Sequence, residues 1–407
     1  MWSTFIKSTF RLLFRHRSFT LVNILGLSIS LAIIILLALY IQHEFSFDNF
    51  HSKADRIYRV EQNMLGGGRT ERMAGTPEPL WQVLKDEFEE IEASMRFVPT
   101  RHILSVPGGE SFNASVAYVE ENFLEVFDFE VISGKQEDML DAPFSMVITE
   151  STARRLFGEE EAIGKSYQAD GVEHLITGII KDPPSNSHIV FDLLISVNTI
   201  NVDDSFSSWG NNWVNLYVLM RDGADIGNFK AKLLPLLKNY RGEENIDELH
   251  IRPLLEIHLK SDLADEYAIR GNINNIYTLI AIALFILIMA GVNFTNLSAA
   301  YNSLRTREIG IRKITGGSRR LLLIQLIGES LTVSLMALLL AFVLYESFLP
   351  LFNQLVNREL SFNYLENKPL FVLIVLVGIS TGLLSTLYPA IMLSGFRPIN
   401  LLQNSIR

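Results

Sequence analysis

Four long apolar stretches constrain this chain more than any other feature of its sequence. A helix needs about 20 apolar residues to cross about 30 Å of hydrocarbon. Such stretches cover residues 20–42, 276–300, 321–345 and 370–393, and only the third contains a charged residue, Glu329. We therefore predict a multi-pass α-helical membrane protein with four transmembrane helices and a large domain between the first and the second.

The first stretch follows several basic residues near the N-terminus, as the core of a signal peptide does. Its apolar run is about twice as long as such a core, and no small-x-small cleavage site follows it. We expect this stretch to remain in the protein as a membrane anchor.

The distribution of basic residues predicts the topology. Lys7, Arg11, Arg15 and Arg17 precede the first stretch, and residues 301–320 carry six Lys and Arg against one acid, Glu308. Basic segments stay in the cytoplasm. We therefore place both termini (residues 1–19 and 394–407) and residues 301–320 in the cytoplasm, and residues 43–275 and 346–369 on the opposite side of the membrane.

Residues 1–19 also contain a candidate amphipathic helix. Apolar and aromatic residues fall on one face, whereas Lys7, Arg11 and Arg15 follow one another at i, i+4 and i+8. We expect this helix to lie in the cytoplasmic membrane interface and to contact lipid. The alternative is that it extends the first transmembrane helix into the cytosol.

The large segment between the first two stretches is acidic. From His43 to Arg270 it holds 21 Lys and Arg against 40 Asp and Glu, a net charge of −19. Alternating or β-rich runs such as Ser145–Thr149, separated by helical patterns such as Gly227–Tyr240, predict an α+β domain. The charge argues against a nucleic-acid partner. The chain has no cysteine, so disulfides and thiol chemistry are excluded and the domain depends on its own core.

No motif in this chain predicts catalysis or cofactor binding. The string Gly158–Ser166 is similar to a phosphate-binding loop, but it has five residues between its glycines where four are needed, and three of them are acidic. The eight histidines have no metal-ligand spacing. His188, within Asp182–His188, is the one histidine of interest, and we expect it to cap a strand and not to bind a metal. We therefore expect no catalytic, cofactor-binding or metal-binding residues.

Within the membrane, Glu329 is the one costly group. It lies about two turns from the cytoplasmic end of its stretch, where an arginine near the interface can pair with it; a proton-relay role is the alternative. Two small-residue patterns, Gly26-x-x-x-Ser30 and Gly378-x-x-x-Gly382, predict close helix packing.

The most specific string is cytoplasmic. It runs from Arg305 to Arg319 and interleaves isoleucines with charges, which a plain topogenic loop does not require. We predict an interfacial helix that presents charge and an apolar knob to a cytoplasmic partner. The residues predicted to make this contact are Arg305, Arg307, Glu308, Ile309, Gly310, Ile311, Arg312 and Lys313.

This string resembles the coupling region of the MacB/FtsX family of ABC transporter permeases. Further strings similar to the family are Asn23–Leu27, Phe47–His51, Asp55–Arg59, Gly178–His188, Tyr388–Ala390 and Arg397-Pro398. The resemblance implies a dimeric unit in a bacterial inner membrane, with residues 43–275 and 346–369 in the periplasm. Such a unit works with cytoplasmic ATPases, which bind ATP and Mg²⁺, and it exports drugs, peptides or lipoproteins or activates cell-wall hydrolases. The chain itself is then no enzyme, and its partners are the ATPase, a second copy or a sister permease, and an adaptor in the periplasm.

Several alternatives stay open at the level of sequence. The chain could be a membrane-anchored sensor or scaffold whose acidic domain binds a periplasmic protein. Within the permease interpretation, the sequence does not identify the substrate or decide between export and hydrolase activation. It also leaves open whether the chain forms a homodimer or a heterodimer, and whether it is one half of a tandem permease.

Overall fold

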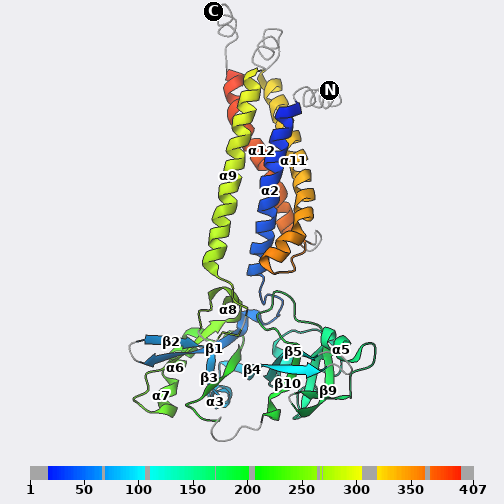
Figure 1. Ribbon diagram of the computed structural model, residues 1–407. Helices are drawn as coiled ribbons and strands as arrows, with labels where there is room; N and C mark the ends of the chain where they lie inside the picture. Colours follow the sequence, from blue (N-terminus) through cyan, green and yellow to red (C-terminus); the bar gives the residue numbers. More distant parts are fainter. Residues whose placement is uncertain are drawn as a thin grey trace, which may run out of the picture. The chain divides into compact units, whose positions relative to one another are not determined.

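The computed structural model describes residues 17–66, 69–105, 111–169, 171–200, 207–263, 266–267, 269–304, 319–362 and 367–395 (Figure 1). The chain divides into two compact units. Met1–His43 and Asn274–Arg407 make up the first, which we call the helical unit. Glu44–Ile273 make up the second, which we call the α+β domain. The N-terminal amphipathic pattern and the string from Arg305 to Lys313 lie outside the described residues.

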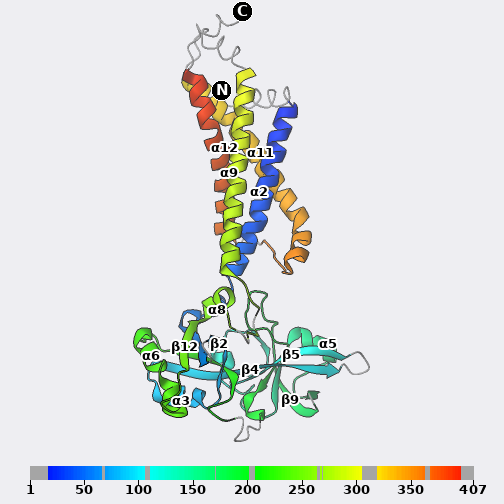
Figure 2. The ribbon, with the colours of Figure 1, turned by 60° about the vertical axis from the view of Figure 1, so that its left-hand side comes forward.

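The helical unit contains four long helices that run side by side (Figures 1 and 2). They are α2 (Arg17–Phe45), α9 (Ile273–Leu304), α11 (Arg319–Val356) and α12 (Lys368–Gly395). Each contains a segment long and apolar enough to cross a membrane. Together with the α+β domain between the first and second of them, this confirms the predicted fold class.

The third helix is longer than the sequence pattern indicated. Residues 346–356 were expected in a loop because Glu346 ends the apolar stretch 321–345, yet α11 continues through Pro350 to Val356. Beyond Glu346, Leu349, Phe352 and Val356 pack against the hydrophobic core of the helical unit. Their spacing of three and four residues keeps one face of the helix apolar, so the helix continues past Glu346.

The core of the helical unit forms where all four helices meet. Leu31 and Ile35 of α2 and Ala337 and Ala341 of α11 are almost completely buried there. Large apolar side chains also face outward on these helices; Leu339 is 69% exposed. A helix that is apolar on its inner and outer faces is typical of a membrane span.

The α+β domain is built on one mixed sheet of twelve strands, in the order β12-β1-β11-β4-β5-β10-β7-β9-β6, with β2, β3 and β8 pairing beside this path. The strands are β1 (Ile57–Gly66), β2 (Arg69–Met73), β3 (Gly75–Pro77), β4 (Ile91–Ser105), β5 (Ser111–Val119), β6 (Val131–Ser133), β7 (Ser145–Thr149), β8 (Ser166–Ala169), β9 (Val172–Ile180), β10 (Leu193–Ser196), β11 (Asn212–Met220) and β12 (Glu248–Pro253). Most pairs are antiparallel, but β5 with β10 and β7 with β9 are parallel.

Short helices connect the strands. They are α3 (Leu80–Glu87), α4 (Phe123–Val126), α5 (Glu150–Phe157), α6 (Ile226–Leu233), α7 (Leu236–Arg241) and α8 (Leu254–Lys260), with 3₁₀ turns at Ala54–Arg56 and Val197–Thr199. The sequence predicted a single helix over residues 227–240. The structure breaks it before α7 because Pro235 has no N–H to continue the ladder.

Strand β4 joins the two halves of the sheet. Its first part, as far as Phe97, pairs with β11, and its second part, from Phe97 to Ser105, pairs with β5. The half around β1 and β11 carries α3, α6 and α7, whereas the half around β7 and β9 carries α5 (Figures 1 and 2). The strand is therefore shared by both halves.

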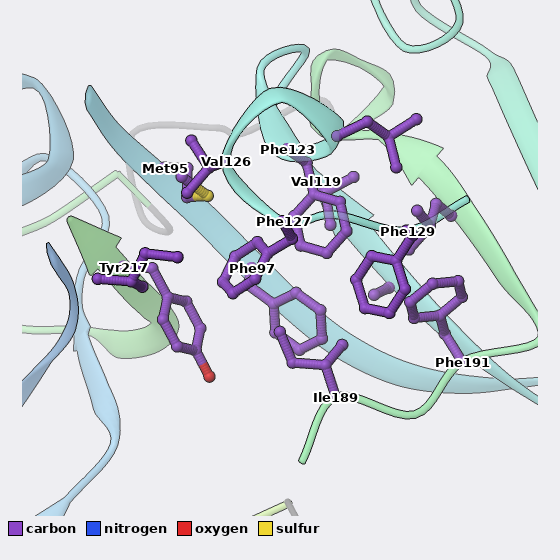
Figure 3. Close-up of a cluster of buried hydrophobic side chains, with 14 of the residues drawn as sticks. Met95, Phe97, Val119, Phe123, Val126, Phe127, Phe129, Ile189, Phe191 and Tyr217 are labelled. Atoms are coloured by element: carbon purple, nitrogen blue, oxygen red, sulfur yellow. The ribbon is translucent and has the colours of Figure 1, made fainter. Parts of the chain in front are cut away.

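The central core of the domain is rich in aromatic rings (Figure 3). Phe97 of β4 lies near Phe123, with ring centroids 6.0 Å apart, and Phe129 meets Phe191 edge-on at 5.0 Å. Tyr217 of β11 closes this cluster against Phe97 and Phe127. The polar hydroxyl of a fully buried tyrosine needs a partner, and that partner leads to the candidate site.

Candidate functional site

The candidate site is a buried polar cluster in the α+β domain, made largely by two segments that connect directly to membrane helices. One segment follows α2 and the other precedes α9. The remaining residues come from the last turn of α2, from β1 and β11, from the loop before β10 and from α8. We call this set the junction cluster: Glu44, Phe47, Asp48, His51, Arg59, Glu61, His188, Tyr217, His258, Glu266 and Tyr267.

The centre of the junction cluster is a chain of four polar side chains. His188 Nδ1 lies 2.8 Å from Asp48 Oδ1, and His188 Nε2 lies 2.9 Å from the Tyr217 hydroxyl. The Tyr217 hydroxyl in turn lies 2.8 Å from that of Tyr267. Asp48 and His188 are completely buried. Burial raises the pKa of both tyrosines, so their hydroxyls stay neutral and can donate along the chain.

Two strings of the sequence meet at this point. The Asp48 N–H donates to Asn186 O at 2.9 Å, and the Asn186 side-chain amide donates to Ser46 O at 2.9 Å. The His188 N–H donates to Asp48 Oδ1 at 3.0 Å. Asp48 has a φ of 61°, a left-handed conformation that Asp tolerates better than most residues. The segment around His188 is therefore hydrogen-bonded to the turn that follows α2.

Arg59 carries a fully buried positive charge next to this chain. Its guanidinium donates to both carboxylate oxygens of Glu266 at 2.8 Å and to Glu61 at 2.9 Å. Arg252 also donates to Glu61, at 2.6 Å. A charge this deeply buried is tolerated only with such partners. Because Glu266 lies in the segment between α8 and α9, Arg59 holds that segment onto the domain.

Tyr267 fastens the same segment through packing. Its ring lies 5.1 Å from that of Phe97 and its hydroxyl meets Tyr217. The segment before α9 is therefore held by an ion pair and by the aromatic core at consecutive residues.

His258 of α8 links the other end of the cluster to Glu44, at the end of α2. His258 Nε2 lies 2.8 Å from Glu44 Oε2, and His258 Nδ1 lies 2.8 Å from Ile269 O. The ring of Phe47 stacks on the imidazole with centroids 3.4 Å apart. A Cβ on Gly271 would fall 2.6 Å from His258 Nε2. A larger residue at position 271 would overlap the His258 ring, so glycine is favoured there.

His51 completes the cluster as a neutral imidazole. Its Nδ1 accepts a hydrogen bond from the Asp128 N–H at 3.0 Å. Burial lowers its pKa to about 4; nearby Asp48 and Asp128 oppose the shift, and His188 adds to it. His51 is therefore uncharged at neutral pH.

The predicted site residues in the membrane take the following positions. Glu329 is 7% exposed, accepts from Gln325 at 2.9 Å and lines a small cavity of about 40 Å³. A Cβ on Gly382 would fall 2.6 Å from Ser334 Cβ, which places Gly382 at a close approach of α12 to α11.

The first of the small-residue patterns makes looser contacts. A Cβ on Gly26 would meet Asn293 of α9 at 3.6 Å, which is an ordinary contact distance. Ser30 donates to Gly26 O within α2, at 2.9 Å. In the second pattern, the backbone oxygen of Gly378 on α12 accepts a hydrogen bond from the Ser334 hydroxyl of α11 at 2.6 Å.

Sequence reasoning identified His188 but missed Arg59, Glu266 and Tyr267. Within the described residues, no group of three or more His, Asp or Glu side chains is arranged to hold a metal. Arg59 could have been found from the alternation in β1, where Ile57, Arg59 and Glu61 occupy the same face and Ile57 is fully buried. Nothing local in the sequence marks residues 266–267.

Four helices long and apolar enough to span a membrane, with an α+β domain between the first and the second, define the class of multi-pass membrane proteins with a large domain outside the helices. The model of the MacB-like periplasmic core domain matches residues 20–236, and that of the FtsX-like permease C-terminal region matches residues 280–398. The chain therefore belongs to the MacB/FtsX family of ABC transporter permeases.

Individual relatives are distant. The chain is 26% identical over 262 residues to the macrolide export ATP-binding/permease protein MacB of Bdellovibrio bacteriovorus, which covers 63% of this chain and 38% of that protein. It is 24% identical over 238 residues to the ABC transporter permease YknZ of Bacillus subtilis. The matched region makes up 56% of this chain and 55% of YknZ. The chain thus spans between a third and about half of the length of these relatives.

Solved structures show a similar partial likeness. A permease-protein domain from Porphyromonas gingivalis matches with a TM-score of 0.44 and 22% identity, over 50% of this chain and 92% of that domain. The periplasmic region of MacB from Actinobacillus actinomycetemcomitans matches with a TM-score of 0.38 and 17% identity, over 50% of this chain and 91% of that region.

Proposed function

We propose that this chain is the permease subunit of an ABC transporter in a bacterial inner membrane, and that ATP hydrolysis on a separate cytoplasmic subunit changes the conformation of its periplasmic α+β domain. The observation that carries the proposal is the junction cluster. Residues that follow α2 and residues that precede α9 enter one buried, charge-paired network. If α2 or α9 moves, this network is therefore the first part of the α+β domain that the movement affects.

The energetics of the cluster favour a stiff connection. Separating Glu266 from Arg59 would leave a buried charge without one of its main partners, which costs about 3–5 kcal/mol in comparable pairs. A flexible linker has no such penalty. Motion of α9 is therefore transmitted to the sheet through Glu266 and Tyr267 and is not absorbed before it reaches the domain.

On the cytoplasmic side, we place the contact with the ATPase at Arg305, Arg307, Glu308, Ile309, Gly310, Ile311, Arg312 and Lys313. ATP and Mg²⁺ then bind to the ATPase, and this chain needs no cofactor of its own. Family membership supports this division of roles. The cargo class is drugs, peptides or lipoproteins. A second permease copy or sister chain and a periplasmic adaptor are the further partners, and both termini face the cytoplasm.

The first experiment tests the ATPase partner. The tagged chain is purified from its native membrane, co-purified proteins are identified by mass spectrometry, and ATP turnover is measured. We expect an ABC ATPase whose turnover Glu308→Arg reduces. Glu359→Arg makes the same charge change in the exposed connection between α11 and α12, and it should leave turnover unchanged. Absence of an ATPase, or equal turnover in both variants, would favour the sensor or scaffold function instead.

The second experiment tests the response of the domain. Because the chain has no cysteine, spin labels can be attached specifically at Ile132→Cys and Leu234→Cys, which are exposed in opposite halves of the sheet. We expect their distance distribution to differ between the nucleotide-free complex and the complex trapped with ATP and vanadate. Identical distributions in the two states would contradict transmission to the domain.

A further inference from the structure

A cavity of about 490 Å³ lies in the α+β domain beside the junction cluster. Its walls come from β4, β5, the loop before β10 and the segment before α9. This volume lies within the range of about 300–1,000 Å³ that small-molecule sites occupy. The side chains that are free to meet an occupant decide what chemistry the cavity can bind.

The inner polar groups of the cavity are already engaged. The Glu266 carboxylate is held by Arg59 on both oxygens, and the Tyr217 hydroxyl is hydrogen-bonded to both Tyr267 and His188. Glu266 and His188 are also almost fully buried. These groups form a fixed floor and leave little hydrogen-bonding capacity for a ligand.

The outer wall of the cavity carries the hydrogen-bond donors that are available to a ligand. Arg101 is exposed and, among the described residues, makes no hydrogen bond or ion pair. Ser115 lies directly opposite Arg101 across β4 and β5, so the two side chains are on the same face of the sheet. An Arg next to a hydroxyl is a recognition pair for a carboxylate, a sulfonate or a phosphate.

Apolar side chains complete the cavity. Val190 is 47% exposed and Ile269 is 37% exposed, and both line the space beside Arg101. Exposed aliphatic side chains at a concave site gain free energy when an apolar ligand covers them. The cavity therefore offers one positive charge and an apolar wall.

We propose that this cavity binds a small amphipathic anion, with its charged group on Arg101 and Ser115 and its apolar part on Val190 and Ile269. The domain carries a net charge of −19, which disfavours anions elsewhere on it. Binding should therefore depend sharply on Arg101. An occupant would also touch Ile269, four residues before α9 begins. The binding itself is independent of the proposed transport function.

The test uses the full chain in nanodiscs of zwitterionic lipid, with 8-anilinonaphthalene-1-sulfonate as the fluorescent probe and empty nanodiscs as the background. We expect saturable binding that Arg101→Gln weakens by about tenfold or more, as loss of a charged hydrogen bond does. Val190→Trp should fill the cavity and also weaken binding. Both positions are exposed, so both variants should fold.

Matched controls separate this site from general adsorption. Arg154→Gln removes an exposed charge on α5, where Arg154 is 70% exposed, and Ile103→Trp adds an exposed ring two residues beyond Arg101. Both should bind the probe as the unmodified chain does. Equal affinity in the unmodified chain and in Arg101→Gln, or equal losses in the control variants, would overturn the proposal.

Competition identifies the source of the anion. Octanoate represents a lipid-derived acid, and N-acetyl-phenylalanine represents a peptide carboxylate. Displacement of the probe by either acid, with the corresponding neutral amide at least about tenfold weaker, supports the site and names its ligand class. Displacement by acids and amides alike would show that charge is not recognised and would refute the proposal.

Discussion

Acidification should destabilise the α+β domain through His51. Burial lowers the pKa of this imidazole from 6.5 to about 4, so the unfolded chain binds a proton in a pH range where the folded domain does not. Folding stability rises with pH wherever the unfolded state binds more protons. The contribution of His51 is therefore complete above pH 6.5 and is lost as the pH falls from 6.5 towards 4.

The size of the effect follows from the shift. Each pKa unit corresponds to about 1.4 kcal/mol. Linkage for a group that titrates at 6.5 unfolded and at about 4 folded then predicts a loss of about 2 kcal/mol between pH 7 and pH 5, and of about 3 kcal/mol by pH 4. In a domain of this length, 2 kcal/mol lowers the Tm by about 4–8 °C.

Denaturant unfolding followed by tryptophan emission measures this loss. Three of the four tryptophans, Trp81, Trp209 and Trp213, lie in the domain. Carboxylates and other histidines also titrate, so the informative quantity is the difference between the unmodified chain and His51→Asn. The asparagine carbonyl can still accept from the Asp128 N–H, but it binds no proton.

The two chains should lose stability to different extents on acidification. We expect the unmodified chain to lose about 2 kcal/mol more than His51→Asn between pH 7 and pH 5. Parallel losses would show that His51 remains accessible to protons in the folded domain, and they would refute the reasoning from burial.

Three further perturbations test the packing of the two units. Gly382→Val should lower the Tm in detergent because its side chain would overlap Ser334, and overpacking costs about 1–3 kcal/mol; an unchanged Tm would contradict the close approach. Gly271→Ala should destabilise the domain by a similar amount in denaturant unfolding, since its Cβ has no space beside the His258 ring. Glu266→Ala should cost about 3 kcal/mol because Arg59 keeps fewer partners, whereas the double variant with Arg59→Met should cost less. A loss in the double variant equal to the sum of the losses in Glu266→Ala and Arg59→Met would mean that the two residues are not coupled.

The membrane helices could be predicted from sequence because lipid imposes a simple requirement. Every residue of a span must be apolar or paired, so the four stretches were visible without any tertiary information. The end of α11 was missed because Glu346 interrupts the apolar run, while packing of Phe352 and Val356 continues the helix. The strand predicted at Ser145–Thr149 matches β7 to the residue, because five residues are too few for a helix and Val147, Ile148 and Thr149 are β-branched.

The junction cluster could not be predicted in the same way. Asp48 and His188 are 140 positions apart, and Arg59 and Glu266 are 207 apart. No local periodicity connects such residues. The two strings around Asp48 and His188 were recognisable by family resemblance, but their meeting depends on how the sheet is ordered. Residues 266 and 267 lie in a segment without regular structure, so neither the periodicity of a helix nor that of a strand predicts which of their side chains are buried.

The composition of the junction cluster bears on why it exists. Replacing a buried ion pair by well-packed apolar residues is often neutral for stability or even stabilising, so stability alone does not require Arg59, Glu61 and Glu266. An apolar cluster, however, could repack in several registers, because apolar contacts have no direction. A bidentate Arg–Glu pair fixes one register between β1 and the segment before α9. The cluster therefore suits a segment that must keep one position against the sheet.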